Sequence, residues 1–501
     1  MDAVTLSVMS AALSGIAEEM GTALVRSASS SNIKERRDCS AALFDAHGRM
    51  VAQAEHIPVH LGAMPESVAA VIARAPRPGD VFVLNDPFAG GSHLPDITLV
   101  SPLDVDGEIV AYACTRAHHS DVGGIVPGSM PAGSTSIWQE GLIIPPVRLD
   151  ESIVIVILSN VRTPEIRRAD LEAQAAANRL GGERLRELVA RRGLETVLAA
   201  FDEVIAYAEL RAREAIRRLP DGRYEAEGEV EGDGVTNEDL PIRVAVTVAG
   251  DAIEIDFDGT APAAAGNVNA PLAVTRAACT FAVKVALGAD VPVNAGLYAT
   301  VSIKAPEGCL VDARAPSAVV AGNVETSQRI ADTVLLALAQ AADVPAQGQG
   351  TMNNVVIGTS GWTYYETLGG GQGASSRGDG PSGVHVGMSN TLNTPIEALE
   401  LELPLRVERY ELLEGSGGRG RHRGGDGLVR TLRVLEPATL SLLTDRRRHP
   451  PQGLNGGEPG RSGRNLLNDE ELASKASREL AAGDVVTVET PGGGGWGRIG
   501  A

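Results

Sequence analysis

The segment His-Leu-Pro-Asp at 93–96 precedes a predicted β-hairpin, and the segment Arg-Ala-His-His-Ser-Asp-Val-Gly-Gly at 116–124 follows it. Residues 96–103 alternate between apolar and polar side chains, the Asp-Val-Asp-Gly at 104–107 is a turn signal, and residues 108–117 form the returning strand. A hairpin of this shape brings its two polar ends together in space.

These two ends hold four residues that bind metals well, His93, Asp96, His118 and His119, with Asp121 just beyond. The whole chain has only nine histidines. A divalent metal needs several imidazole nitrogens and carboxylate oxygens at one point. Adjacent side chains of an extended backbone point to opposite faces, so we expect only one of His118 and His119 to be a ligand. The other would contact substrate or act as an acid or base. The alternative interpretation is a structural hydrogen-bond network.

Composition limits the class of protein. A chain of 501 residues predicts at least two domains. Hydrophobic residues make up 43% and mean hydropathy is +0.00, as in globular proteins. Aromatic residues are 3% while glycines number 58, so the core must be built from Ala, Val, Leu and Ile. The net charge of −20 disfavours nucleic acid and anionic membranes as partners.

The lack of a recognisable signal peptide or membrane span and the scattered cysteines predict a cytoplasmic protein. The start Met1-Asp2 lacks the basic region of a signal peptide, and the longest aliphatic run, 153–158, is far too short to span a membrane. The four cysteines are scattered without a Cys-x-x-Cys pair, which predicts reduced thiols.

Periodicity predicts the elements outside the hairpin. Apolar residues at helical spacing indicate an N-terminal helix over 6–24. Residues 164–219 predict an antiparallel helix pair with a possible third helix, broken at Gly181-Gly182 and at Gly193. A hairpin is expected over 244–257, and helices near 271–287 and 325–342. Polar residues at 322–327 would cap the last helix or line a pocket.

The fold class is therefore α+β: a large multidomain chain with β-rich N-terminal and C-terminal regions and a helical segment between them. The final third is rich in glycine, yet none of its glycines forms a phosphate-binding loop, so we expect no nucleotide site there. The predicted regions are an N-terminal helix with a β-rich metal-site region, a helical segment, an α+β region and a Gly-rich β region, at 1–160, 161–220, 221–345 and 346–501.

Further residues are candidates for the same pocket. Asp38 is a candidate metal ligand, or the ion-pair partner of a neighbouring arginine. His56 and His60 bracket a proline turn and are expected to line the pocket, and Glu140 is a candidate base. The basic cluster at 445–449 is expected at the surface or in a subunit contact, with anion binding left open. Without a Gly-x-Ser-x-Gly elbow, metal-activated water is favoured over a serine nucleophile.

Long segments of the chain resemble the hydantoinase B/oxoprolinase family, the B-type subunits of ATP-dependent hydantoinases. They follow the family's order along nearly the whole chain, which makes the resemblance highly specific. The segments are IKERRD (33–38), AEHIPVHLG (54–62), NDPFAGGSHLPD (85–96), RAHHSDVGG (116–124), GNVETSQ (322–328), GTMNN (350–354) and TPGGGGWG (490–497).

The resemblance implies a division of labour. An A-type, ATPase-like partner subunit would use ATP to phosphorylate a small cyclic amide, and the B-type subunit would open the ring with water in a hetero-oligomer. It implies a divalent metal, zinc or manganese among others, since mixed nitrogen and oxygen ligands suit several. The alternative is a subunit of an ATP-dependent acetone- or acetophenone-type carboxylase.

The resemblance also suggests roles for particular residues. The metal ligands that the resemblance implies are His93, Asp96 and His118, with Asp38 as the fourth. His119 and Asp121 are the expected catalytic acid and base, or further ligands.

Overall fold

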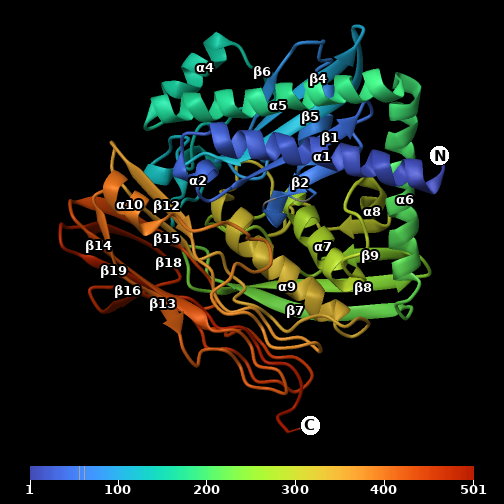
Figure 1. Cartoon of the computed structure of the whole chain (residues 1–501). Helices are drawn as coiled ribbons and strands as arrows, with labels where there is room; N and C mark the ends of the chain where they lie inside the picture. Colours follow the sequence, from blue (N-terminus) through green and yellow to red (C-terminus); the bar gives the residue numbers. More distant parts are fainter. Residues whose placement is uncertain (56, 61, 501) are drawn as a thin grey trace.

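The computed structural model describes residues 1–55, 57–60 and 62–500 (Figure 1). An antiparallel sheet of six strands forms the N-terminal part around the predicted hairpin, whose strands pair with Asp96 opposite His118. The hairpin prediction is therefore confirmed. In spatial order the strands are β2 (Met50–Glu55), β1 (Cys39–Asp45), β5 (Glu108–His118), β4 (Asp96–Val105), β3 (Phe82–Leu84) and β6 (Val147–Arg148).

Helices cover both faces of this sheet. The long helices α1 (Ala3–Ser27) and α5 (Pro164–Arg192) lie side by side across one face, and α3 (Met64–Ile72) packs against the other (Figure 1). Successive residues of β1 serve the two faces, since Leu43 joins the apolar cluster under α1 and Phe44 joins the cluster under α3.

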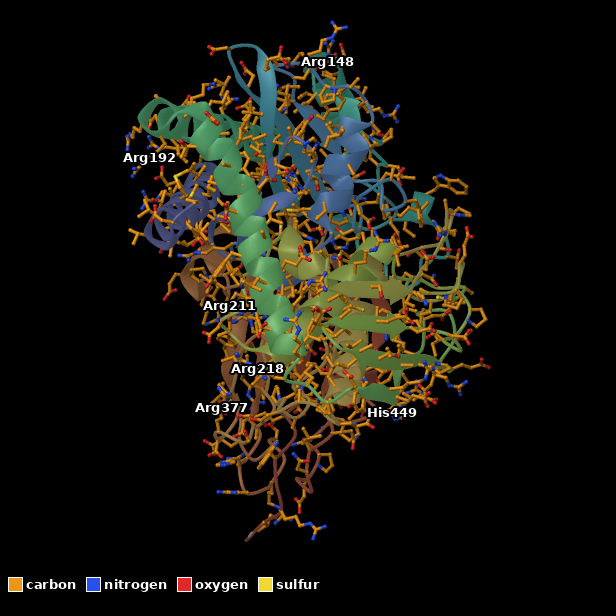
Figure 2. The ribbon with its side chains drawn as sticks, turned by 90° about the vertical axis from the view of Figure 1, so that its right-hand side faces the viewer. Arg148, Arg192, Arg211, Arg218, Arg377 and His449 are labelled. Carbon is orange, nitrogen blue, oxygen red and sulfur yellow. The ribbon has the colours of Figure 1, made fainter. Side chains whose placement is uncertain are left out.

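The predicted helix break at Gly181-Gly182 is wrong. Helix α5 continues through both glycines to Arg192, and α6 (Leu194–Ile216) starts after Gly193, so the region 164–219 holds two helices and no third. A Cβ on Gly181 would lie 2.5 Å from Met20 Sδ, so these glycines serve the close packing of α1 on α5. Arg192 and Arg218 of this segment face outward in Figure 2, whereas Arg167 and Asp170 are buried and form an ion pair at 3.4 Å.

A second sheet forms the middle of the chain, and the helices α7 (Leu272–Leu287) and α9 (Ser327–Leu338) pack beside it (Figure 1). Helix α9 is preceded by a π-helical turn, η4 (Gly322–Thr326), where a helix cap or pocket lining was predicted. The strands, in spatial order, are β10 (Val301–Lys304), β9 (Ala252–Asp256), β8 (Asp239–Ala249) and β7 (Gly222–Glu231).

Two more sheets, held together by a leucine- and valine-rich core, form the C-terminal third. One contains β12 (Thr363–Thr367), β11 (Asn354–Gly358), β15 (Ala438–Leu443) and β18 (Lys475–Leu480). The other contains β13 (Leu405–Leu413), β14 (Gly427–Val434), β19 (Val485–Glu489), β16 (Arg464–Leu467) and β17 (Glu470–Leu472). Below them, glycine-rich loops approach closely, and a Cβ on Gly493 would lie 2.1 Å from the Gln372 carbonyl oxygen.

The α+β fold class is confirmed by these four sheets and their helices. Among the described residues, no helix combines the length and apolar character that crossing a membrane requires. The remaining short elements are α2 (Ser31–Lys34), η1 (Pro58–His60), η2 (Pro127–Ser129), η3 (Ile137–Gln139), α4 (Glu151–Leu158), α8 (Ala295–Tyr298) and α10 (Ile396–Glu402).

The basic cluster at 445–449 does not lie wholly at the surface as predicted. Asp445 and Arg446 are buried: Asp445 contacts Lys475 Nζ at 3.0 Å, and Arg446 contacts Asp332 at 2.7 Å. Arg446 thus connects the C-terminal sheets to α9, whereas Arg448 and His449 stay partly exposed and pair with Asp239.

A buried histidine and aspartate cluster as candidate metal centre

His93, Asp96 and His118 form a buried cluster in which one potential ligand atom from each residue lies within 4.8 Å of the others. Asp96 Oδ1 is 3.0 Å from His93 Nε2 and 3.2 Å from His118 Nδ1. The hairpin explains this arrangement. Asp96 opens β4, His118 ends β5 directly opposite, and His93 lies in the turn that leads into β4.

The cluster has buried nitrogens that no protein group satisfies. Nδ1 of His93 and Nε2 of His118 make no hydrogen bond, while Nε2 of His93 contacts the Asp96 carboxylate at 3.0 Å. A buried polar atom without a partner costs free energy, so such atoms call for an explanation. Burial lowers the pKa of His118 to about 4, which leaves its imidazole neutral at pH 7, the form that binds metals. This donor set fits a divalent cation.

Asp96 is held in place by several polar neighbours. Its Oδ2 accepts a hydrogen bond of 2.7 Å from Ser92 Oγ and lies 3.6 Å from His60 Nε2 and 3.5 Å from Asn323 Nδ2. Burial by itself would raise the pKa of Asp96, but the neighbouring His93 and the contacts with His118 and His60 hold it well below its ordinary value. The carboxylate is therefore ionised at neutral pH.

A small cavity of about 20 Å³ adjoins the cluster. This volume is enough for one water molecule or ion. Three distant parts of the chain contribute its walls: the N-terminal sheet, the π-helical turn η4 and the C-terminal sheets. The lining residues that carry polar side chains are Asp38, His60, Asp96, His118, Asn323, Tyr365, Thr367, Ser389 and Thr391.

Tyr365 fixes the orientation of His118. Their rings are stacked, with centroids 4.5 Å apart and planes 15° apart, and the Arg36 guanidinium lies 4.8 Å from the centroid of the Tyr365 ring. The Tyr365 hydroxyl donates to Asn354 Oδ1 at 3.0 Å, and Asn354 Nδ2 donates to Glu325 Oε1 at 3.0 Å. A buried polar chain thus runs from the cluster to η4.

Asp38, the predicted fourth ligand, lines the same cavity without belonging to the three-residue cluster. One of its oxygens lies 4.0 Å from Arg36, and its backbone carbonyl accepts from the backbone N–H of His118. Burial raises the pKa of the Asp38 carboxyl to about 7, although Arg36 opposes the shift.

The structure does not bring His119 and Asp121 into the cluster. His119 Nε2 lies 2.9 Å from Gln174 Oε1 of α5, on the opposite side of the sheet from His118. Asp121 contacts Arg162 at 2.9 Å and accepts from the backbone N–H groups of Gly123 and Gly128. Neither residue lines the cavity beside the cluster, and the predicted acid and base roles stay a prediction.

Of the other residues predicted for the pocket, His60 lines the cavity and Glu140 does not. His60 lines the cavity, as predicted, and its Nδ1 lies 2.9 Å from Ser40 Oγ. Glu140 instead accepts from the backbone N–H groups of Val319 and Val320, and burial raises its pKa to about 7. His56 lies outside the described residues.

Sequence reasoning missed Ser92, Tyr365 and the direct contact of Asn323 with Asp96. Ser92 stands beside His93, and Asn323 lies in a polar stretch that was expected to line a pocket, so local signals existed for both. Tyr365 had no such signal, because only the tertiary structure stacks it on His118.

With this site and fold, the chain belongs to the hydantoinase B/oxoprolinase family, which it matches over residues 2–499. It is 40% identical to 5-oxoprolinase 1 of Arabidopsis thaliana, over 99% of this chain but 42% of that protein. The chain thus spans about two fifths of that relative. It is also 32% identical to the B-type subunit of a putative D-/L-hydantoinase from Pseudomonas sp. strain NS671, over 99% of this chain and 90% of that protein.

Solved structures agree with this membership. The ATP-dependent caprolactamase from Pseudomonas jessenii superposes with a TM-score of 0.90 and 29% identity, over 99% of this chain and 91% of that chain. Acetone carboxylase superposes with a TM-score of 0.89 over 99% of this chain and 75% of that chain. At 18% identity, the second match demonstrates a shared fold only.

Proposed function

We propose that this chain is the catalytic B-type subunit of an ATP-dependent cyclic amidase of the hydantoinase or 5-oxoprolinase type. The observation that carries the proposal is the buried cluster of His93, Asp96 and His118, whose imidazoles keep unpaired nitrogens beside a cavity that fits one ion or water. Relatives named for the opening of cyclic amides support the substrate class.

His93, Asp96 and His118 would hold a divalent cation, zinc or manganese, with Asp38 as a further ligand when it is ionised. Two imidazoles with one or two carboxylates suit several such metals. When bound there, the cation would supply Lewis acidity and lower the pKa of a water.

The protein's own groups prepare the site for a hydrolytic step. Ser92 and His60 fix the Asp96 carboxylate, and Tyr365 fixes the His118 ring. Burial lowers the pKa of His60, so its imidazole is neutral at pH 7. His60 also lines the cavity, and with Nε2 toward Asp96 and Nδ1 2.9 Å from Ser40 Oγ it would act as a positioning residue for the carboxylate.

The use of ATP would belong to an A-type, ATPase-like partner, in a cytoplasmic hetero-oligomer. The chain carries no phosphate-binding loop of the Walker type. A relative of nearly the same length is named as a subunit, and the caprolactamase is named as ATP-dependent. The partner would phosphorylate the amide oxygen and so make the ring carbon electrophilic for attack by water.

Elemental analysis of the purified chain tests the site. We expect about one divalent metal per chain in the wild type and none in His93→Ala/His118→Ala. His119→Ala is the matched control, since it removes a neighbouring buried histidine outside the cluster, and it should keep the metal. Retention of metal in the double variant, or loss of metal only in His119→Ala, would contradict the assignment.

The reaction itself is tested with the A-type partner. ATP hydrolysis that depends on a hydantoin, 5-oxoproline or a lactam, with release of the ring-opened product, is the expected result. A requirement for bicarbonate together with a ketone substrate would show a carboxylase instead.

A further inference from the structure

The metal cavity has a wall of hydroxyl groups in addition to the candidate ligands. Ser389 and Thr391, from the segment that follows the glycine-rich loops, line the cavity together with Thr367 of β12. All three residues are buried. The function proposed above gives these hydroxyls no role.

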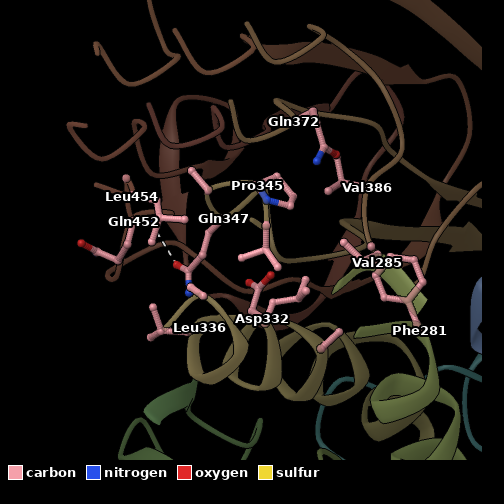
Figure 3. Close-up of a pocket in the computed structure, with 18 residues that line it drawn as sticks. Phe281, Val285, Asp332, Leu336, Pro345, Gln347, Gln372, Val386, Gln452 and Leu454 are labelled. Carbon is pink, nitrogen blue, oxygen red and sulfur yellow. Dashed lines mark hydrogen bonds between the residues drawn. The ribbon is translucent and has the colours of Figure 1, made fainter. Parts of the chain in front are cut away.

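The segment that carries Ser389 is held firmly in place. Val386 lines a separate, larger cavity between α7 and α9 (Figure 3), so the segment runs between two cavities. Gln328 fixes it there, because its Nε2 donates to the Val386 carbonyl at 2.9 Å and its Oε1 accepts from the Met388 backbone N–H at 3.2 Å. Ser389 therefore has little freedom to move away from the metal cavity.

His385 connects the two hydroxyls of this segment. Its Nδ1 lies 2.7 Å from Ser389 Oγ, and its Nε2 lies 3.2 Å from Thr391 Oγ1. His385 is half-buried and does not line the metal cavity itself. Burial, reinforced by the charge of Arg36, lowers the pKa of His385 to about 3, so its ring is neutral at pH 7. A neutral imidazole donates from one nitrogen and accepts at the other.

The hydrogen bonds continue from Thr391 to a buried arginine. Thr391 Oγ1 lies 2.7 Å from Thr367 Oγ1, and Arg36 Nη2 donates to Thr367 Oγ1 at 2.7 Å. A guanidinium only donates hydrogen bonds. The chain of polar groups thus begins at a fixed donor and leads through two threonines and His385 to Ser389.

The charge of Arg36 sets the direction of these hydrogen bonds. Hydroxyl groups near a cation have the lowest energy when their oxygens point toward it and their hydrogens point away. Thr367 then donates to Thr391, which in turn donates to Nε2 of His385. Nδ1 of His385 consequently carries the proton and donates to Ser389 Oγ. Ser389 keeps its own O–H for the cavity, since no described residue accepts it.

We propose that the Ser389 hydroxyl binds and orients the attacking water in the metal cavity, and that His385 is the positioning residue that keeps this hydroxyl a donor. The cavity has room for one water, and a donor in its wall would bind the water oxygen. That hydrogen bond is stronger to a hydroxide than to a water, because the acceptor is charged. The inference rests on the proposed function, since it assigns a further group to the same reaction.

The tautomer of His385 tests the direction of the chain without an assay of activity. Long-range ¹H–¹⁵N NMR of the full chain with labelled histidine distinguishes a protonated ring nitrogen from an accepting one, and His385→Gln identifies the signals. We expect the proton on Nδ1 in the wild type. Thr367→Val removes the link to Arg36 and should shift the proton at least partly to Nε2. A proton on Nε2 in the wild type would overturn the inference.

Steady-state kinetics with the A-type partner and a cyclic amide tests the role of the hydroxyl. Ser389→Ala should lower kcat at least about tenfold, with KM changed by less than about twofold and the metal retained. His385→Leu should also lower kcat, and His385→Gln should recover part of the loss, because its amide can still accept and donate. Thr394→Val is the matched control, since it removes a buried hydroxyl near Thr391 that does not line the cavity, and it should keep the wild-type kcat.

A wild-type kcat in Ser389→Ala would overturn the inference, as would equal losses in His385→Leu and His385→Gln or an equal loss in Thr394→Val. Circular dichroism and metal content establish that the variants are folded. If His385→Leu does not fold, Ser389→Ala and the NMR measurement still decide. A proton on Nδ1 in a wild type that opens no cyclic amide would support the hydroxyl chain and count against the proposed function alone.

Discussion

At the scale of single residues, the direction of each side chain decides which groups belong to the candidate site. His118 and His119 are adjacent and both buried, yet one faces the cavity and the other hydrogen-bonds to α5. The alternation of an extended backbone is enough to separate them. Burial also sets protonation states, because it lowers the pKa of His118 and raises that of Glu325.

Glu325 gives a prediction for pH dependence. Burial raises its pKa from 4.5 to about 8, so the folded protein binds one proton more than the unfolded chain between these values. The stability from this group is complete below the unfolded pKa and is lost as pH rises through the folded pKa. Relative to Glu325→Gln, the wild type should lose up to about 1.4 kcal/mol per pH unit across this window.

Urea unfolding of both proteins from about pH 5 to about pH 8.5 measures this difference. A difference that stays constant across the range would mean that Glu325 is ionised in the folded protein. If the unfolding free energy of the wild type rises relative to that of the variant as pH rises, the pH dependence has the opposite sign and contradicts the raised pKa of Glu325.

At the scale of elements, close packing decides where helices run. Glycines usually weaken a helix, yet α5 passes through Gly181 and Gly182 because α1 and the sheet press against them. The two glycines therefore stabilise the fold by allowing close contact between elements, an effect that local helix propensity does not describe.

Gly181→Leu should destabilise the protein by about 1–3 kcal/mol, since its side chain must displace Met20 from a fully buried position. Gly15→Ala in α1 is the control: no atom lies within 4 Å of the added Cβ, and the change should stabilise by about 0.5–1 kcal/mol. Thermal or chemical unfolding measures both. Stabilisation by Gly181→Leu would show that α1 and α5 are not tightly packed there.

At the scale of the whole molecule, the candidate site lies where distant parts of the chain meet. Asp96 and Asn323 come together from the first sheet and η4, and Tyr365 is added from the C-terminal sheets. Buried polar contacts hold these parts in place. The Glu231 carboxylate at the end of β7, for example, accepts from the backbone N–H groups of Arg447 and Arg448 at 2.8 Å and of His449 at 2.6 Å. The domain boundaries predicted from composition stay a prediction.

Glu231→Ala should therefore cost about 3–5 kcal/mol of unfolding free energy, because it leaves three backbone donors without a partner at a buried contact. The control Glu227→Ala removes an exposed carboxylate of the same strand that pairs with Arg243 at 3.1 Å, and should cost no more than about 0.5 kcal/mol. Guanidinium unfolding compares the two. Equal, small effects would show that the contact of β7 with 447–449 adds little stability.

The hairpin at 96–118, the gathering of His93, Asp96 and His118 at its ends and the resemblance to the family could all be predicted from the amino-acid sequence. These features depend on local signals: alternation, turn residues and motifs that are continuous in the chain. The stacking of Tyr365 on His118, the contact of Asn323 with Asp96 and the burial of Asp445 and Arg446 were visible only in the folded protein, which also places His118, the ligand that the resemblance favoured, at the cavity. The physical reason is that these contacts join residues far apart in the chain, and packing and the pairing of buried charges select them after the local elements have formed.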